Sequence, residues 1–201
     1  VDSANAVNFY KNIQKQLANN LLADITPSVS NERGGKFIAK TITDGKYDTY
    51  WATEDSIITA TIEFSLPEKK KINRMMLQEY IPLGQRVKTF SVEHRKNGKW
   101  FPVKLNEETT TIGYKRLLRF ETINTDTIRI NIADSRACPC INNIEAYYAG
   151  ETDEISFKTD TKKLNSFPFK IQGISDNEIL KATDGNDSTS CFIKSNTVII
   201  D

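Results

Sequence analysis

The first apolar pattern along the chain has the period of a helix. Apolar side chains recur at steps of three or four residues, at Ala6, Tyr10, Ile13, Leu17 and Leu21. Such spacing places one apolar stripe on a helix, so we expect a helix over residues 3 to about 19. A lone helix of this length is marginal in water, and its stripe must therefore pack against the following domain or against another part of the protein.

From Ser28 to about Ala149 the pattern changes to the period of two that is typical of strands. The alternating positions are Ala60, Ile62, Phe64 and Leu66, then Phe90 and Val92, then Ile128, Ile130 and Ile132. Turn signals separate them at Leu66-Pro67-Glu68, Pro82-Leu83-Gly84, Asn97-Gly98 and Ile112-Gly113. Asn97-Gly98 between two alternating runs predicts a hairpin. Many short strands at this spacing predict an all-β antiparallel sandwich or jelly roll.

One loop pattern occurs twice. Thr43-Asp44-Gly45 leads through Thr49 to Tyr50-Trp51, and Thr183-Asp184-Gly185 leads through Thr189 to Phe192. Recurrence of the loop pattern about one domain length further along the chain predicts two copies of one domain in tandem, of which the second is cut off at Asp201.

Charge and apolar content narrow the function classes. The chain has 27 basic and 26 acidic residues, so its net charge of +1 favours neither nucleic acid nor an anionic membrane as partner. No apolar run approaches the roughly 18 residues that a membrane-spanning helix needs.

The three cysteines, Cys138, Cys140 and Cys191, do not suggest a disulfide framework. We expect small buried thiols, with a strained Cys138–Cys140 bridge as the alternative.

The loop at Asp44 has two interpretations. Calcium takes six to eight oxygen ligands, and a tight loop with a glycine can turn its carbonyls inward beside the Asp44 carboxylate and the Thr49 hydroxyl. The alternative is an Asx turn, in which Asp44 accepts hydrogen bonds from backbone N–H groups and Gly45 adopts a positive φ.

Catalytic chemistry is not indicated within this chain. His94 is the only histidine, and it follows Phe90 and Val92 at period two, which predicts a structural position near the edge of the core. The acidic residues are scattered, so their spacing gives no pair for glycoside hydrolysis.

A sugar site would combine an aromatic face with a few polar groups. The segment 78–86 offers Glu79, Tyr80, Gln85 and Arg86, and Trp51 follows the Asp44 loop. The structural alternatives are core packing for Trp51 and an ion pair for Arg86.

Several segments carry a family resemblance. Thr43-Asp44-Gly45 through Trp51-Ala52-Thr53 resembles the opening signature of discoidin-like domains, also called coagulation factor V/VIII type C domains. Segments 77–87 (LQEYIPLGQRV), 110–118 (TTIGYKRLL) and Arg136-Ala137-Cys138-Pro139 resemble the C-terminal region of bacterial α-L-fucosidases. The leading helix resembles the connector that follows the catalytic barrel of those enzymes.

The resemblance implies a jelly-roll β-sandwich of the galactose-binding-like fold. It implies a linker helix at 1–23 after a catalytic domain, a sandwich at 24–150 and the truncated start of a second module at 151–201. The family's structural Ca²⁺ site would fall on the side chains of Asp44 and Thr49 and on the carbonyls of Thr41, Lys46, Thr49 and Asn142. Asn143 stands where the family usually has a glutamate ligand, which should weaken the site.

We therefore expect a non-catalytic accessory module of an exported, periplasmic or extracellular, α-L-fucosidase. It would bind glycan through Tyr80, Arg86, Glu79 and Trp51, or brace the catalytic barrel of the same polypeptide. The alternative is a stand-alone carbohydrate-binding or adhesion protein with tandem discoidin-like domains.

Overall fold

The computed structural model describes residues 3–150, and the description below is confined to them. The chain divides into two units, Val1–Thr152 and Asp153–Asp201. The expected second module at 151–201, with its repeat of the Asp-Gly loop and with Cys191, lies outside the described residues.

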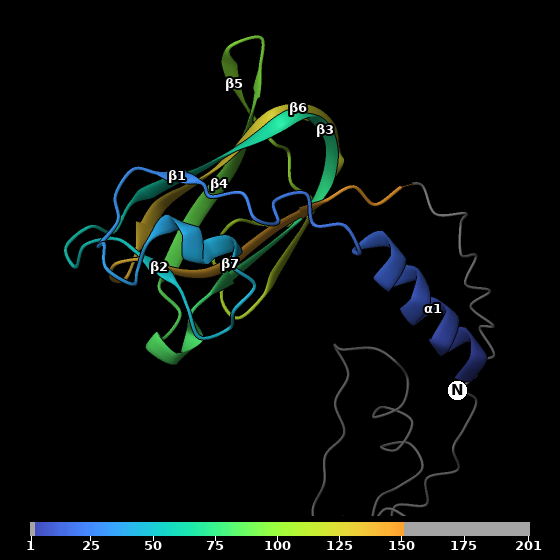
Figure 1. Ribbon diagram of the computed structural model, residues 1–201, viewed down its shortest axis with the longest axis horizontal. Helices are drawn as coiled ribbons and strands as arrows, with labels where there is room; N and C mark the ends of the chain where they lie inside the picture. The colour runs from blue at the N-terminus through green and yellow to red at the C-terminus, as the bar shows by residue number, and fades with distance from the viewer. Residues whose placement is uncertain (1–2, 151–201) are drawn as a thin grey trace, which may run out of the picture. The chain divides into compact units, whose positions relative to one another are not determined.

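The described unit consists of one helix followed by β-structure, which confirms the predicted fold class (Figure 1). The helix α1 spans Ser3–Gln16, and two short 3₁₀ helices span Ala39–Thr43 (η1) and Ile81–Leu83 (η2). The strands are β1 (Ser28–Val29), β2 (Trp51–Ala52), β3 (Ala60–Glu79), β4 (Val87–Lys96), β5 (Lys99–Pro102), β6 (Arg116–Ser135) and β7 (Cys140–Tyr147).

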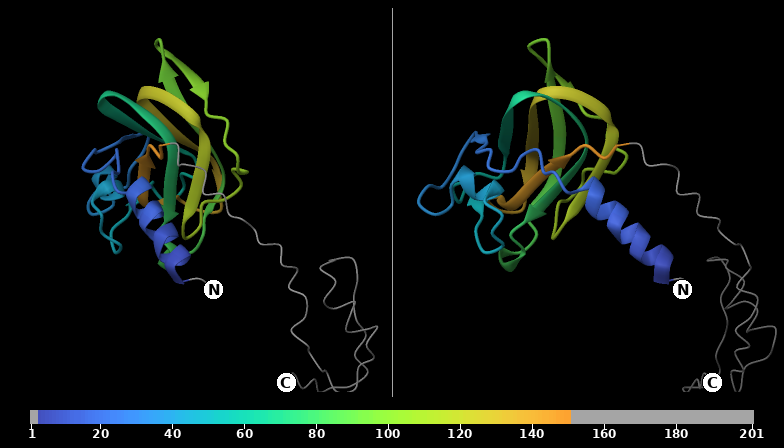
Figure 2. Two further views of the ribbon diagram at one scale, coloured as in Figure 1. Left: turned by 90° about the vertical axis from the view of Figure 1, so that its right-hand side faces the viewer. Right: turned by 45° about the vertical axis from the view of Figure 1, so that its right-hand side comes forward.

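All strand pairs are antiparallel, and β3 and β6 dominate the topology. The hydrogen-bonded order is β2-β7-β3-β6-β4-β5, and β1 pairs with β3 outside this path. Figure 2 shows β3 and β6 curving together, which folds the sheet over itself and encloses a core. The jelly-roll β-sandwich is confirmed.

The turn expected at Leu66-Pro67-Glu68 is instead an irregularity within one long strand. The β3–β6 register breaks between Ser65 and Lys70, and Pro67 lies in this gap. Proline has no N–H to donate to a strand ladder, so the pairing is interrupted there and the strand can bend without ending. By contrast, Asn97 and Gly98 have φ values of 52° and 76°, and they join β4 to β5 as the predicted hairpin.

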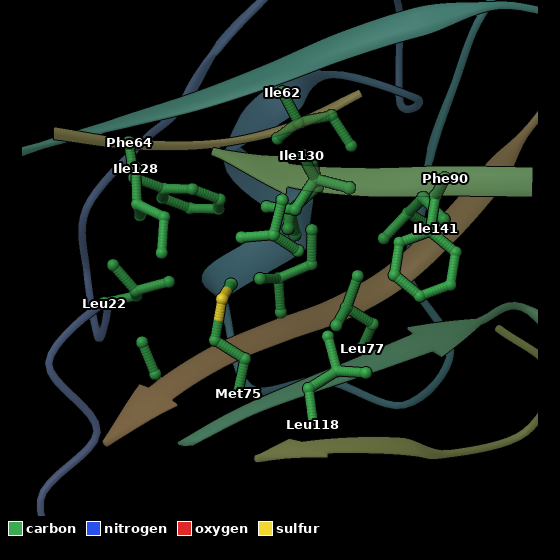
Figure 3. Packing of buried hydrophobic residues seen from close by; sticks show 14 of the residues in the cluster. Leu22, Ile62, Phe64, Met75, Leu77, Phe90, Leu118, Ile128, Ile130 and Ile141 are labelled. Atoms are coloured by element: carbon green, nitrogen blue, oxygen red, sulfur yellow. The ribbon is translucent and has the colours of Figure 1, made fainter. Parts of the chain in front are cut away.

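The core lies between the two halves of the bent sheet. Alternate residues of β3 lie beside those of β6 on the inner face of the sheet, as in the pairs Ile62↔Ile130 and Phe64↔Ile128. Figure 3 shows these side chains in one buried cluster with Phe90 from β4 and Ile141 from β7. All of them are at most 1% exposed, so the period-two pattern identified the core correctly.

The helix ends earlier than its apolar stripe suggested. It stops at Gln16 rather than near residue 19, and Tyr10 remains 61% exposed. Ile13 and Leu17 line a groove of about 360 Å³ whose other wall includes Met75, Leu117 and Tyr147. The described residues therefore cover only part of the stripe.

Asparagine side chains tie the start of the domain to its end. The Asn20 Oδ1 accepts hydrogen bonds from the backbone N–H groups of Leu22 and Ala146, both at 3.1 Å. The buried Asn73 amide pairs with both backbone groups of Ala149, at 2.8 and 2.9 Å. These contacts hold the last strand and the segment after it against the rest of the domain.

Candidate functional site

The Asp44 loop lies between η1 and β2 and adopts the Asx turn foreseen as one of its two interpretations. The Asp44 Oδ1 accepts a hydrogen bond from the Lys46 N–H at 2.9 Å, and Gly45 has a φ of 69°. The Thr49 hydroxyl donates to the Asp44 Oδ2 at 2.8 Å. The carboxylate therefore closes the loop on itself.

Three backbone carbonyls of this loop point at a single side chain of β7. The Asn142 Nδ2 lies 3.2 Å from the Lys46 oxygen, 3.0 Å from the Tyr47 oxygen and 2.7 Å from the Thr49 oxygen. Asn142 is 4% exposed, so these carbonyls have exchanged water for the amide.

The side chain of Asn143, which stands where the family usually has a glutamate ligand, does not point into this arrangement. The Asn143 side chain donates to Glu145 at 2.8 Å and takes no part in the loop. Thr41 was expected to contribute its carbonyl, and its hydroxyl donates to the Ile38 carbonyl at 2.8 Å within the turn of η1.

The residues at the loop do not fit a calcium ion as they are arranged. Calcium binds oxygens at about 2.3–2.6 Å, and its ligands must converge on a point that no donor occupies. Here the point of convergence of the three carbonyls holds the Asn142 amide nitrogen at hydrogen-bonding distances. Within residues 3–150, no group of three or more His, Cys, Asp and Glu side chains could hold a metal.

Tyrosine side chains gather beside this loop. The rings of Tyr50 and Tyr80 are stacked with centroids 4.2 Å apart, and Phe37 lies 4.9 Å from Tyr50. Tyr47 and Tyr114 lie 6.4 Å apart and are 55% and 57% exposed. We call Tyr47, Tyr50, Tyr80 and Tyr114 the tyrosine cluster.

The tyrosine cluster offers phenol hydroxyls and ring faces. Partial burial raises the pKa of Tyr50, and burial together with the neighbouring Tyr114 raises the pKa of Tyr47. Both hydroxyls therefore stay protonated at neutral pH and can donate as well as accept hydrogen bonds. Ring faces with such hydroxyls suit a sugar or a partly polar protein surface.

Glu79 positions the loops that carry Tyr80 and Tyr114. Its Oε1 accepts hydrogen bonds from the N–H groups of Arg86 and Val87, at 2.7 and 2.8 Å, and its Oε2 accepts from Gly113 at 2.7 Å. The side chain is 1% exposed. Glu79, expected to contact ligand, is thus enclosed and holds loops instead.

Arg86 is directed inward toward two cysteines. Its guanidinium donates to the Cys138 carbonyl at 2.9 Å and lies 2.8 and 3.2 Å from the sulfurs of Cys138 and Cys140. Both cysteines are buried and free, as expected, and burial raises the pKa of Cys140 to about 12. Arg33 also lies 3.2 Å from the Cys138 sulfur.

Trp51 packs in the core rather than at the surface. It is 0% exposed and pairs with Ile141 across β2 and β7. Of the four residues expected to contact ligand, Tyr80 is the one with an aromatic face in the tyrosine cluster. Sequence reasoning missed Tyr47 and Tyr114, whose only signal was a tyrosine within a predicted loop.

The remaining candidates for chemistry are structural. His94 is half-buried, 6.1 Å from Phe101, and burial lowers its pKa. It pairs with Phe101 and Ile128 across the sheet, near the edge of the core as predicted.

Among the described residues, no helix is long and apolar enough to cross a membrane.

The bent antiparallel sandwich with its Asp-Gly loop defines a discoidin-type module, which is a non-catalytic class of domain. The chain belongs to the F5/8 type C domain family, whose family model matches residues 25–145.

Its relatives include α-L-fucosidases. The chain is 27% identical over 143 residues to alpha-L-fucosidase 1 of Arabidopsis thaliana, covering 68% of this chain and 28% of the relative. It is 31% identical to a GH29 fucosidase of Ruminococcus gnavus solved with fucose, with a TM-score of 0.64, covering 72% of this chain and 29% of that chain. The chain therefore spans under a third of the length of these relatives.

A second group of similar structures shows the fold alone. Chitosan-binding module 2 of a chitosanase/glucanase from Paenibacillus sp. IK-5, solved with chitotriose, is 18% identical with a TM-score of 0.57. The match covers 64% of this chain and 100% of that module.

Proposed function

We propose that residues 24–150 form the accessory module of an exported α-L-fucosidase that acts on fucosylated glycans, with the tyrosine cluster as its contact surface. The observation that carries this proposal is that the chain has a higher sequence identity to the fucosidases than to the chitosan-binding module. Identity is 27% and 31% with the two fucosidases described above and 18% with the chitosan-binding module, although the fold is shared by both.

The contact surface would meet either a glycan or the catalytic barrel of the same polypeptide. Its aromatic faces and hydroxyls suit both partners. The loops that carry Tyr80 and Tyr114 are fixed by Glu79, so little conformational entropy would be lost on contact.

The first test concerns the parent protein. Sequencing the gene on the 5′ side of the codon for Val1 should show a region that encodes an α/β barrel. A signal peptide directly before Val1 would instead support a stand-alone adhesion protein and overturn the fucosidase proposal.

The second test concerns the module itself. We expect the purified chain to release no nitrophenol from nitrophenyl α-L-fucoside, because the carboxylates of the reaction would lie on the barrel. Measurable release would contradict the accessory role.

The third test separates glycan binding from bracing. On an array of fucosylated glycans, a signal that Tyr80→Ala removes and Tyr148→Ala leaves unchanged would show glycan binding by the cluster. Tyr148 is a matched control because it is an exposed tyrosine outside the cluster, 5.7 Å from Lys71. A blank array for the unaltered chain would remove glycan binding and leave contact with the barrel.

A further inference from the structure

The Asp44 loop meets β7 where three carbonyls of the loop converge on the buried side chain of Asn142. In a calcium-binding loop, a cation at this point would neutralise the partial negative charge of the carbonyls. Without a cation or a hydrogen-bond donor at this point, the partial negative charges of the three carbonyl oxygens would repel one another.

Asn142 supplies a donor at this point. Its Nδ2 is 2.7–3.2 Å from the oxygens of Lys46, Tyr47 and Thr49, which places one amide nitrogen within reach of all three. The orientation of the amide follows from this contact, because the Oδ1 in the same place would face three acceptors and repel them.

The carboxylate beside this point is also occupied. The Asp44 oxygens already accept hydrogen bonds from the Lys46 N–H and from the Thr49 hydroxyl. The polar groups of the loop are thus paired with one another and with Asn142.

We propose that the Asn142 amide replaces the cation, so that this module closes its Asp-Gly loop by hydrogen bonds and folds independently of calcium. Asn142 is available for this because β7 has an irregularity there. Gln78 pairs with Asn143 and Glu79 with Ile141, which leaves Asn142 as the extra residue of a bulge. The bulge directs the side chain of Asn142 at the loop and that of Asn143 at Glu145.

Thermal unfolding with excess EDTA and with millimolar CaCl₂ tests the proposal. The Tm of the unaltered chain should be the same in both solutions. A rise with calcium that EDTA reverses would overturn the proposal.

The variant Asn142→Asp should acquire the calcium dependence that the natural residue removes. Its carboxylate faces three carbonyls, so it should be less stable in EDTA than the unaltered chain. Calcium at about 100 times its Kd should then raise the Tm by about 5–10 °C. The matched control is Asn143→Asp, which adds the same charge one residue along β7 but away from the loop, and it should show no calcium response.

Calorimetric titration with CaCl₂ keeps the test decisive if Asn142→Asp does not fold in EDTA. Heat of binding for Asn142→Asp titrated from its calcium-free state, accompanied by recovery of the folded circular-dichroism spectrum, with no heat for the unaltered chain, supports the replacement. Calcium binding by the unaltered chain, or none by a folded Asn142→Asp, contradicts it.

Discussion

At the scale of single residues, buried polar side chains place the loops of this domain. Glu79 shows this most clearly, because one carboxylate accepts from three backbone N–H groups of two separate loops. A buried carboxylate with several N–H partners is stabilising only while all of its partners are in place.

We predict that Glu79→Ala lowers the free energy of unfolding by about 3–5 kcal/mol, because it leaves buried N–H groups unpaired. Urea denaturation followed by tryptophan fluorescence measures the loss. The control is Glu121→Ala on the exposed side of β6, which should change stability by less than about 0.5 kcal/mol. An equally small effect for both variants would refute the role given to Glu79.

At the scale of elements, the β4–β6 ladder carries an ion pair that makes stability depend on pH. Burial raises the pKa of Glu93, but hydrogen bonds from Arg129 and Asn131, both at 2.6 Å, outweigh it and hold the pKa below its usual range. The Arg129 guanidinium also lies 3.9 Å from the Trp100 ring centroid, which links this ladder to β5. The three strands therefore share one charged cluster.

Because the pKa of Glu93 is lower in the folded state, its contribution to stability is present above the unfolded value of 4.5. It is lost as the pH falls through the lower, folded pKa. We predict that the urea midpoint falls as the pH is lowered below 4.5, and that Glu93→Gln falls less steeply over the same range. Parallel pH profiles for the two proteins would count against this assignment.

At the scale of the whole module, asparagine side chains form hydrogen bonds that hold the first and last segments of the domain in place. Asn73 of β3 makes both an N–H and a carbonyl contact with Ala149, and Asn20 bonds to Ala146. These contacts hold both ends of the described domain against its sheet.

We predict that Asn73→Ala destabilises the module by about 2–3 kcal/mol, because it leaves buried backbone groups of Ala149 unpaired. Asn73→Asp should restore only part of this, since a carboxylate accepts from the Ala149 N–H but cannot donate to its carbonyl. Hydrogen exchange at the Ala149 amide measures the effect directly, with the exposed Asn124→Ala as control. Unchanged protection in Asn73→Ala would show that the last segment is held by other contacts.

Local signals in the sequence determined the architecture. Side chains alternate across a strand with period two, so the core residues of β3, β4 and β6 could be named without coordinates. Asn97-Gly98 specified its hairpin because both residues tolerate positive φ. The Asp-Gly loop likewise indicated an Asx turn, since this depends on contacts between residues close in the chain.

Tertiary structure alone decided which side chains the sites use. Pro67 was expected in a turn. Instead, β3 continues through it, because β3 pairs with β6 both before and after the proline. Trp51 and Glu79 were expected to contact a ligand, but the folded sheet buries both side chains. A bulge in β7 decided between two adjacent asparagines, because one extra residue reverses which side chain faces the loop. Such outcomes depend on strand register between distant segments, which no local pattern encodes.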